Sequence, residues 1–521
     1  MIKKNKYFEV IFFLCIFIIS LFLNLAVQKY QFPNTDTNQN DLFSNLLIEQ
    51  GLFRYNNELN QKYNPPIFGI RGLLNFGDGF VPSSIPGTII ILALFKFISS
   101  KIIFLINPLF VFIGLYYFYR IIDKFIFKGQ SYSLITTALF FFEGAFLYVS
   151  STPFKDLVAT SLFFVGLYYF LNAIHEKKRS DFLLFGFFAG VTIWLNYPSI
   201  IFYFPVVIFY LFNIKKDFFK KEIFKNLAVC STLFLVVFFP LFVYQVKLFN
   251  GFLNFNNPLF QLNHFEAFSK KTGVLDFILA IDFHQLFTNF YYQIFLVNPL
   301  LVYFSILALI FIFLSYKKER SVNKILIIFS AIILMQFLFF LGKKWSGVFF
   351  EGSVGTSYAR YLLVSWGLLT VLSVYTIKKL IYKKIILSVL IIFFIFSGLN
   401  KGLYSDMAIK YFIDTSKRAN NIKEAIVLKT PENSIFFTSF HDKYIYPVRQ
   451  TAVYVAIPKD ERIDKTLMLM KNLLEDGYSV YIVDEKDKYA ISPSQDRKIF
   501  EKERLSVQYA FGENIYKIEQ K

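Results

Sequence analysis

Long apolar runs recur along the first 400 positions and are separated by short polar segments. A run of about 20 apolar residues is long enough to cross a bilayer as a helix. We therefore expect an all-α polytopic membrane protein with about 11 transmembrane helices, within a range of 10–13. The expected spans are residues 8–27, 102–119, 132–150, 157–174, 182–196, 199–212, 224–246, 294–315, 325–341, 358–377 and 385–399.

One further apolar run, residues 85–98, is ambiguous because it has only about 14 residues, short of a bilayer's width, and follows Pro82. If it crossed the membrane, the basic loops after it would divide between both sides. If it lies in the interface, all the basic loops fall on one side, as the positive-inside rule requires. The pattern thus predicts an interfacial helix here.

The basic residues decide the expected orientation. The chain carries 55 Lys and Arg against 36 Asp and Glu, a net charge of +19. Most of the excess lies in short stretches between apolar runs, which is typical of the cytoplasmic loops of membrane proteins and not of a nucleic-acid surface. The stretches are residues 3–6, 120–128, 177–179, 215–225, 317–324 and 378–384.

Composition excludes several classes. Hydrophobic residues make up 55% and charged residues 17%, unlike a soluble enzyme or a disordered chain. The apolar run 8–27 is longer than a signal-peptide core, so we expect a retained first helix with its amino end in the cytoplasm. Eleven spans then place the carboxyl end outside. The expected location is the cell (plasma) membrane, multi-pass.

The tail after about residue 400 changes character. Its apolar runs shorten to strand length at 434–439 and 478–483, and a helical pattern at 464–475 precedes Gly477, a helix stop. We expect residues 1–400 to form the membrane domain, including a long first outer loop (28–101) that carries interfacial helices. Residues 401–521 are expected to form a small extracytoplasmic α/β domain.

Four acidic residues are candidates for chemistry at the outer face. Asp36 lies in the first outer loop without an evident structural role, whereas Asp41 is expected to be the N-cap of a surface helix at 42–52. Asp156 follows the third span and is either an N-cap or a site acid. Glu143 is placed about 10 Å inside the third span, where a carboxylate is a functional candidate by default or bonds a neighbouring helix.

Cations on the same face could hold a lipid phosphate. Arginine binds phosphate with two parallel hydrogen bonds, and lysine supplies a point charge. The candidates are Arg71, Lys343, Lys344 and Arg360, the last followed by Tyr361 at the start of the tenth span. The alternative is that such side chains only reach toward lipid headgroups.

A metal or nucleotide site is not indicated by any motif. His264 and His284 lie twenty residues apart without a Cys or acidic partner at ligand spacing. No glycine-rich phosphate loop appears in the sequence. No cofactor is therefore assigned, although the outer acids permit a divalent cation without requiring one.

Several short motifs occur in a recognisable order along the chain. They are Pro33-x-x-Asp36, Leu47-x-x-x-Gly51, Pro65-Pro66, Pro86-Gly87, Ser150-x-x-Pro153-x-x-Asp156, Gly186-x-x-Ala-Gly190, Asn298-Pro-Leu-Leu301 and Arg360-Tyr361. This order resembles the GT-C superfamily of polytopic glycosyltransferases over residues 1–400. Within it, the pattern is most similar to the branch of protein O-mannosyltransferases, lipid A aminoarabinose transferases and their uncharacterised prokaryotic relatives.

The resemblance implies an inverting transfer of a sugar from a polyprenyl-phosphate-linked donor to a protein, lipid or glycan acceptor at the outer face. It implies that Asp36 is the general base, that Asp156 lines the same cavity and that Arg360 contacts the carrier phosphate. Asp36, Asp156 and Arg360 would then share one hollow. The chain departs from the mannosyltransferases in having Thr37 after Asp36 where they commonly have Glu.

Two other classes remain open at this point. A lipid or glycan transporter (flippase) would show internal repeats and charges deep in several spans. The sequence has no evident repeat, and Glu143 is the one acid well inside an expected span. A non-catalytic membrane assembly protein would use its outer domain to bind a partner. Loss of sugar transfer in Asp36→Asn separates the enzyme from both.

Overall fold

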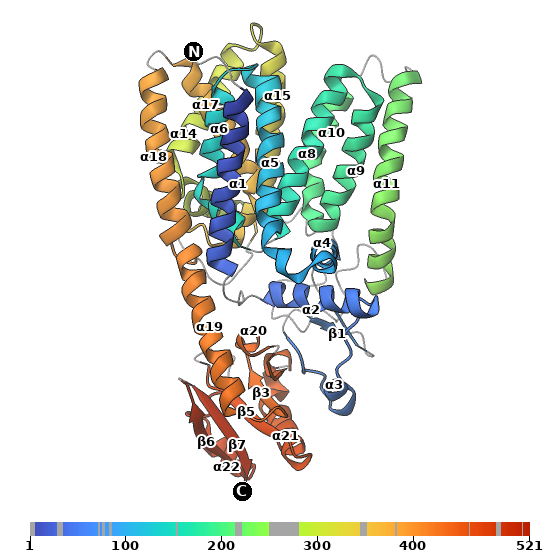
Figure 1. Ribbon diagram of the computed structural model, residues 1–521, viewed down its shortest axis with the longest axis vertical. Coiled ribbons are helices and arrows are strands. Elements are labelled where there is room, and N and C mark those ends of the chain that lie inside the picture. Colours follow the sequence, from blue (N-terminus) through green and yellow to red (C-terminus); the bar gives the residue numbers. More distant parts are fainter. Residues whose placement is uncertain are drawn as a thin grey trace. The chain divides into compact units, whose positions relative to one another are not determined.

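The computed structural model of the protein describes residues 6–28, 35–70, 73–75, 79–82, 86–152, 155–213, 221–249, 281–343, 352–380, 383–446, 448–457, 459–485, 491–512 and 514–521. The chain divides into two compact units (Figure 1). The helical unit comprises Met1–Lys29, Lys101–Phe252 and Leu275–Phe412. The mixed unit comprises Tyr30–Ser100, Leu253–Val274 and Ile413–Lys521.

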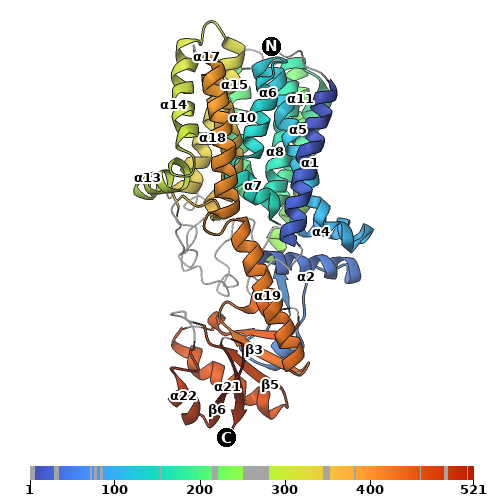
Figure 2. The ribbon, with the colours of Figure 1, turned by 60° about the vertical axis from the view of Figure 1, so that its left-hand side comes forward.

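The helical unit consists of helices, and most of the long ones run alongside one another (Figure 2). They are α1 (Lys6–Gln28), α5 (Ile106–Ile122), α6 (Tyr132–Phe141), α7 (Gly144–Ser151), α8 (Lys155–Glu176), α9 (Arg179–Leu195), α10 (Ile200–Asn213), α11 (Lys221–Phe249), α13 (Phe283–Phe290), α14 (Pro299–Leu314), α15 (Arg320–Gln336), α16 (Ser357–Tyr361), α17 (Leu363–Lys379) and α18 (Lys383–Tyr404). Helix α19 (Ile409–Lys429) crosses the boundary between the units.

Membrane-spanning length is reached by six helices among the described residues, or by up to eight if each bent helix pair is one span. Helices α9 and α17 fall just short with 17 residues each. The chain is thus a mostly helical membrane protein with a small carboxyl-terminal sheet. The finer count of about 11 spans and the orientation of the termini stay predictions.

Two expected spans are broken. Residues 132–150 form α6 and α7, bent by 62°, and residues 294–315 belong to a pair, Phe283–Phe295 and Pro299–Leu314, bent by 113°. The apolar pattern gave no indication of either bend. New helices begin there because Glu143 caps α7 and Asn298, followed by Pro299, caps α14.

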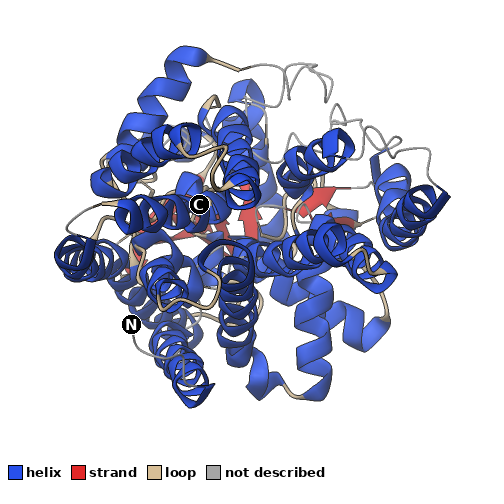
Figure 3. Cartoon of the chain, turned by 90° about the horizontal axis from the view of Figure 1, so that it is seen from above, coloured by secondary structure: helices blue, strands red, loops and turns tan. Residues whose placement is uncertain are grey.

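Glycines allow close helix packing in this unit, seen end-on in Figure 3. A Cβ on Gly186 of α9 would lie 2.4 Å from the Cys230 carbonyl oxygen on α11. A Cβ on Gly398 of α18 would lie 1.7 Å from the Phe142 carbonyl oxygen, at the break between α6 and α7. Small residues at such crossings let helix backbones approach closely. Close packing matters in a bilayer because lipid provides no hydrophobic driving force for helix association.

Strands and short helices make up the mixed unit. Its elements are α2 (Thr35–Gln50), α3 (Glu58–Lys62), β1 (Leu73–Asn75), β2 (Phe80–Pro82), α4 (Pro86–Ile98), β3 (Ser434–Thr438), α20 (Asp442–Ile445), β4 (Gln450–Val453), α21 (Arg462–Glu475), β5 (Ser479–Val483), α22 (Arg497–Lys502), β6 (Leu505–Phe511) and β7 (Ile515–Gln520). The main sheet has the order β4-β3-β5-β7-β6, with β3 parallel to β4 and β5. The strands predicted at 434–439 and 478–483 are confirmed, as is the helix stop at Gly477, where φ is +82°.

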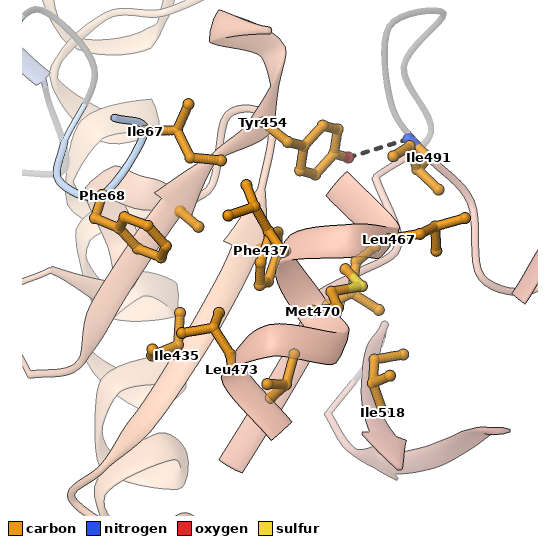
Figure 4. Packing of buried hydrophobic residues seen from close by; sticks show 14 of the residues in the cluster. Ile67, Phe68, Ile435, Phe437, Tyr454, Leu467, Met470, Leu473, Ile491 and Ile518 are labelled. Carbon is orange, nitrogen blue, oxygen red and sulfur yellow. Dashed lines mark hydrogen bonds between the residues drawn. The ribbon is translucent and has the colours of Figure 1, made fainter. Parts of the chain in front are cut away.

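Part of the first loop packs on this sheet. Gly69 N–H donates to the Thr451 carbonyl at 2.8 Å, and Val453 N–H donates to the Ile67 carbonyl at 2.8 Å. Phe68 is fully buried in the same core as Phe437 (Figure 4). Contacts therefore group residues 30–100 with the carboxyl-terminal unit.

Helix α2 begins earlier than the sequence indicated. Its expected start near Asp41 was wrong, since the helix runs from Thr35 and places Asp41 in its interior. The first turns carry few apolar residues, but Asn38 and Gln39 are buried, and Asn38 Nδ2 donates to the Lys443 carbonyl at 3.1 Å. Tertiary contacts extend the helix beyond its apolar pattern. Helix α4 matches the run 85–98, and its place in the interface stays a prediction.

Candidate functional site

Asp156 is the buried acid of the helical unit with an unsatisfied oxygen. It lies in the first turn of α8 and is 2% exposed. Asn196 Nδ2 lies 3.5 Å from Asp156 Oδ1, whereas Oδ2 has no hydrogen-bond partner among the described residues. A buried oxygen without a partner costs about 1–3 kcal/mol, so the site favours a ligand that donates to it.

Two asparagines fix the chain before Asp156. Asn24 of α1 donates through Nδ2 to the Ser150 carbonyl at 2.8 Å, and Asn107 of α5 donates to the Thr152 carbonyl at 2.7 Å. Both asparagines are buried. The end of α7 is thus held from two sides, which limits where α8 and its acid can begin.

Arg360 approaches the same region from a distant part of the sequence. It lies on the short helix α16, whose start is capped by the Thr356 hydroxyl. Helix α16 contacts both α7 and α8. The buried Tyr148 of α7 lies within electrostatic range of both the Arg360 guanidinium and the Asp156 carboxylate. The structure therefore brings Asp156 and Arg360 to a common neighbour.

Tyr361 supports the arginine. Its ring stacks on Phe340 with centroids 5.2 Å apart and planes 25° apart. The Arg360 guanidinium lies 5.7 Å from the Tyr361 ring centroid, and its Nη2 donates to Ser357 Oγ at 3.2 Å. The cation is thus oriented from both sides by its own helix.

Asn289 on α13 is a buried polar hub that sequence reasoning missed. Its Nδ2 donates to the Leu341 carbonyl at 2.7 Å and to the Tyr358 hydroxyl at 3.0 Å. Tyr358 in turn donates to the Lys343 carbonyl at 2.7 Å. A polar residue in apolar surroundings is the signal that could have found it. This hub ties α16 to the chain around Lys343.

Lys343 is a second cation, after Arg360, near the hub at Asn289. Its Nζ lies 4.3 Å from the Phe339 ring centroid. Burial lowers the pKa of Lys343 to about 8. Its charge therefore depends on pH in the ordinary working range. The neighbouring candidate Lys344 and the loop cation Arg71 lie outside the described residues.

Glu143 has a different setting from Asp156. Its carboxylate accepts hydrogen bonds from Ala145 N–H at 2.9 Å and from Phe146 N–H at 3.1 Å, and so caps α7. Lys401 of α18 supplies a nearby positive charge. One alternative for Glu143 was a hydrogen bond to a neighbouring helix. The structure shows instead hydrogen bonds from the first N–H groups of α7, the helix that follows it.

The two loop acids belong to the mixed unit. Asp36 is the second residue of α2, and its side chain lies outside the described residues. Asp41 Oδ1 accepts from Lys96 Nζ at 2.6 Å, and Lys96 also donates to Asn45 Oδ1 at 2.6 Å. Asp41 thus joins α2 to α4.

Metal ligands do not cluster in the part of the chain that the structure describes, where no group of three or more His, Cys, Asp or Glu could hold an ion. His284 lies on α13, and His264 falls outside the described residues.

Comparisons with known proteins address the fold. A family model described as dolichyl-phosphate-mannose-protein mannosyltransferase matches residues 88–244. The crystal structure of ArnT from Cupriavidus metallidurans bound to undecaprenyl phosphate is similar, with a TM-score of 0.61 at 11% identity over 99% of this chain and 98% of that one. Its apo form gives 0.59 at 12% identity, over 98% and 97%. No curated protein matches. The family model matches part of the expected membrane domain, and the solved structures show that the chain shares the fold of ArnT over nearly its whole length; both agree with the resemblance to the GT-C superfamily.

Proposed function

We propose that this chain is a membrane glycosyltransferase that moves a sugar from a polyprenyl-phosphate-linked donor to a protein, lipid or glycan acceptor. The proposal is supported by the placement of a buried acid, Asp156, in the first turn of α8 and a cation, Arg360, on α16, which contacts α7 and α8, in a fold shared with ArnT. The bound lipid in the similar ArnT structure, undecaprenyl phosphate, is the model for the donor's carrier.

The proposed reaction is an inverting displacement. An acceptor hydroxyl attacks the anomeric carbon from the face opposite the phosphate, and the new C–O bond forms as the bond to the phosphate oxygen breaks. The electron pair leaves with the lipid phosphate. The hydroxyl proton passes to Asp36, the residue to which the resemblance gives the part of base.

Arg360 and Lys343 are proposed to stabilise the leaving phosphate. A lipid phosphate that gains charge in the transition state is stabilised by fixed cations in a water-poor site. The Arg360 guanidinium lies against Ser357 and Tyr361, and the backbone of Lys343 is held by the hub at Tyr358, with its Nζ over the Phe339 ring. Cations held in this way need little reorganisation during the reaction.

Asp156 is proposed to orient the sugar or the acceptor. Its Oδ1 faces Asn196, whereas Oδ2 is buried without a partner among the described residues. A substrate hydroxyl donating to Oδ2 would satisfy that oxygen and lock the sugar's position. The orienting role and the part of Asp36 as base are separate proposals.

The test measures sugar transfer in membranes or proteoliposomes containing the full-length protein and a labelled polyprenyl-phosphate-linked sugar. Asp36→Asn is expected to lower kcat by about 100-fold or more, because removing a general base costs 10²–10⁴ in rate. Glu49→Gln, on the same helix, is the matched control and is expected to leave the rate unchanged.

Two outcomes would contradict this proposal. Transfer that survives in Asp36→Asn removes that residue as the base. Labelled carrier lipid that crosses the vesicle membrane, with no sugar transferred under any condition, favours a transporter. Mass spectrometry of surface glycans with and without the protein would then identify the sugar and the acceptor.

A further inference from the structure

A cavity of about 800 Å³ lies at one end of the helical unit, away from the proposed site. Its lining residues come from the turn between α14 and α15 with the start of α15, the end of α17, and the segment that follows α5. Its lining includes six cations and one acid among the described residues. The cations are Lys128, Lys317, Lys318, Arg320, Lys324 and Lys378.

The cavity and the proposed site lie at opposite ends of the same helices. Helix α15 starts at Arg320 beside the cavity, and its continuation ends at Leu341 next to Lys343. Helix α17 starts after Arg360 and ends near Lys378. A helix of 17 residues is about 25 Å long, close to the hydrocarbon thickness of a bilayer. The cavity therefore lies where we expect one membrane surface to be.

The single acid of the lining, Glu319, is already neutralised. It forms an ion pair with Lys379 and accepts a hydrogen bond from the Tyr375 hydroxyl at 3.0 Å. Burial would raise the pKa of Glu319, but the hydrogen bonds from Lys379 and Tyr375 hold it below its usual range. Glu319 thus interacts directly with Lys379, which is outside the lining, while cations outnumber acids six to one among the described lining residues.

The floor of the cavity is a connected polar network. Tyr375 also donates to Asn323 Oδ1 at 3.1 Å, and Asn323 Nδ2 donates to Ser315 Oγ at 3.1 Å. Asn323 is fully buried. These bonds tie the α14–α15 turn to α17. The cations above them are thus carried on a fixed surface and not on a loose loop.

The basic turn between α8 and α9 allows a comparison between the cations of the cavity and those of another polar loop. Between α8 and α9, Lys178 pairs with Glu176 at 2.6 Å, and Lys124 pairs with the same carboxylate. There an acid is shared between two lysines. In the cavity, six cations and the single acid Glu319 share one hollow among the described lining residues.

We propose that this cavity binds the phosphate-bearing headgroup of an anionic phospholipid from the leaflet at that end. Clustered Lys and Arg between membrane helices match such headgroups, and each cation near an anionic surface contributes about fivefold in affinity. Arg320 adds paired hydrogen bonds to phosphate oxygens. The inference stands apart from the proposed transfer reaction, since no residue of that site takes part.

The test is native mass spectrometry of the full-length protein in detergent with added phosphatidylglycerol or phosphatidylcholine. The wild type is expected to retain phosphatidylglycerol preferentially. The triple variant Lys317→Gln/Lys318→Gln/Arg320→Gln is expected to bind it about a hundredfold more weakly, from about fivefold per cation. The matched control Lys177→Gln/Lys178→Gln/Arg179→Gln removes equal charge from the α8–α9 turn and should change binding less than about fivefold.

Several results would overturn the proposal. Equal losses in both triple variants would mean that general surface charge, and not the cavity, holds the lipid. Displacement of the lipid by inorganic phosphate as readily as by short-chain phosphatidylglycerol would make the cavity a site for free phosphate. Lys317→Arg/Lys318→Arg, which keeps the charge, must retain binding. Thermal unfolding of each variant checks that a loss is not a loss of fold.

Discussion

Two buried acids in the helical unit, Glu143 and Asp156, lie at the two ends of the short helix α7 and its connection to α8. They are similarly buried, at 4% and 2% exposed. Glu143 satisfies its carboxylate with two backbone N–H groups and has Lys401 nearby. Asp156 has one weak contact and one oxygen without a partner among the described residues.

The difference indicates what each acid does. A satisfied carboxylate at a helix start contributes to stability, because it caps free N–H groups and meets the positive end of the helix dipole. An unsatisfied buried carboxylate costs stability, and such a cost is typical of residues kept for a ligand. Glu143 is thus interpreted as a structural residue and Asp156 as a functional one. Burial alone would not have separated them.

The largest expected effect concerns Asp156→Asn. Sugar transfer should fall by about 100-fold or more, since an oriented acid in the site is lost. The unfolding temperature should hold or rise, because the change removes a buried charge. Asp181→Asn, a buried acid at the start of α9, is the control and should leave transfer intact. An equal loss of sugar transfer in Asp156→Asn and Asp181→Asn would show that any buried acid has this effect. Asp156 would then not be distinguished as the functional acid from Glu143.

Glu143→Ala should give the opposite pattern. We expect a loss of about 2–3 kcal/mol in stability, from the missing cap and the unpaired amides. The rate per folded molecule should stay near that of the wild type. Glu143→Asp keeps a capping carboxylate and should recover most of the stability in thermal unfolding. A large fall in kcat without destabilisation would make Glu143 part of the reaction.

Asn289→Ala tests the hub that positions α16. The variant removes hydrogen bonds to Leu341 and Tyr358, so we expect a loss of about 1–2 kcal/mol in stability. Because Arg360 follows closely after Tyr358, KM for the donor should rise about tenfold. Gln285→Ala, which removes only a bond to Asn289 on the same helix, is the matched control. An unchanged KM would show that the hub does not position Arg360.

The smallest expected effect is the pH dependence at Lys343, whose pKa burial lowers to about 8. As the pH rises through 8, the lysine loses its charge, and KM for the donor should rise about fivefold. The free energy of unfolding should increase with pH over the same range, since the unfolded chain then binds more protons than the folded one. Lys343→Arg should remove the pH dependence while keeping the lower KM. A flat profile in the wild type would exclude a role for this charge.

The fold was largely predictable where one physical constraint dominates. Backbone in a bilayer must satisfy its own hydrogen bonds, so long apolar runs become helices. The runs beginning at residues 8, 157 and 224 therefore match α1, α8 and α11 closely. The tail strands β3 and β5 were equally clear, because short β-rich runs are bounded by turn residues.

The breaks in the helices were not predictable from the apolar pattern. Residues 132–150 are apolar across the bend, and only the cap at Glu143 and the close approach of Gly398 place it. Likewise, the early start of α2 depends on burial of Asn38 and Gln39 against the mixed unit's own residues. Such contacts join positions hundreds of residues apart, so no local pattern carries them.

The candidate site divides in the same way. By itself, the sequence determined a membrane-spanning helical chain with basic loops, a small α/β tail and a set of acids and cations in a GT-C-like order. Only the tertiary structure decided that Asp156 has an oxygen without a partner among the described residues while Glu143 is capped, and that Arg360 lies within electrostatic range of Tyr148, more than 200 residues earlier in the chain. The reason is physical: residue type and hydropathy act locally, whereas burial and hydrogen-bond satisfaction depend on which helices pack together.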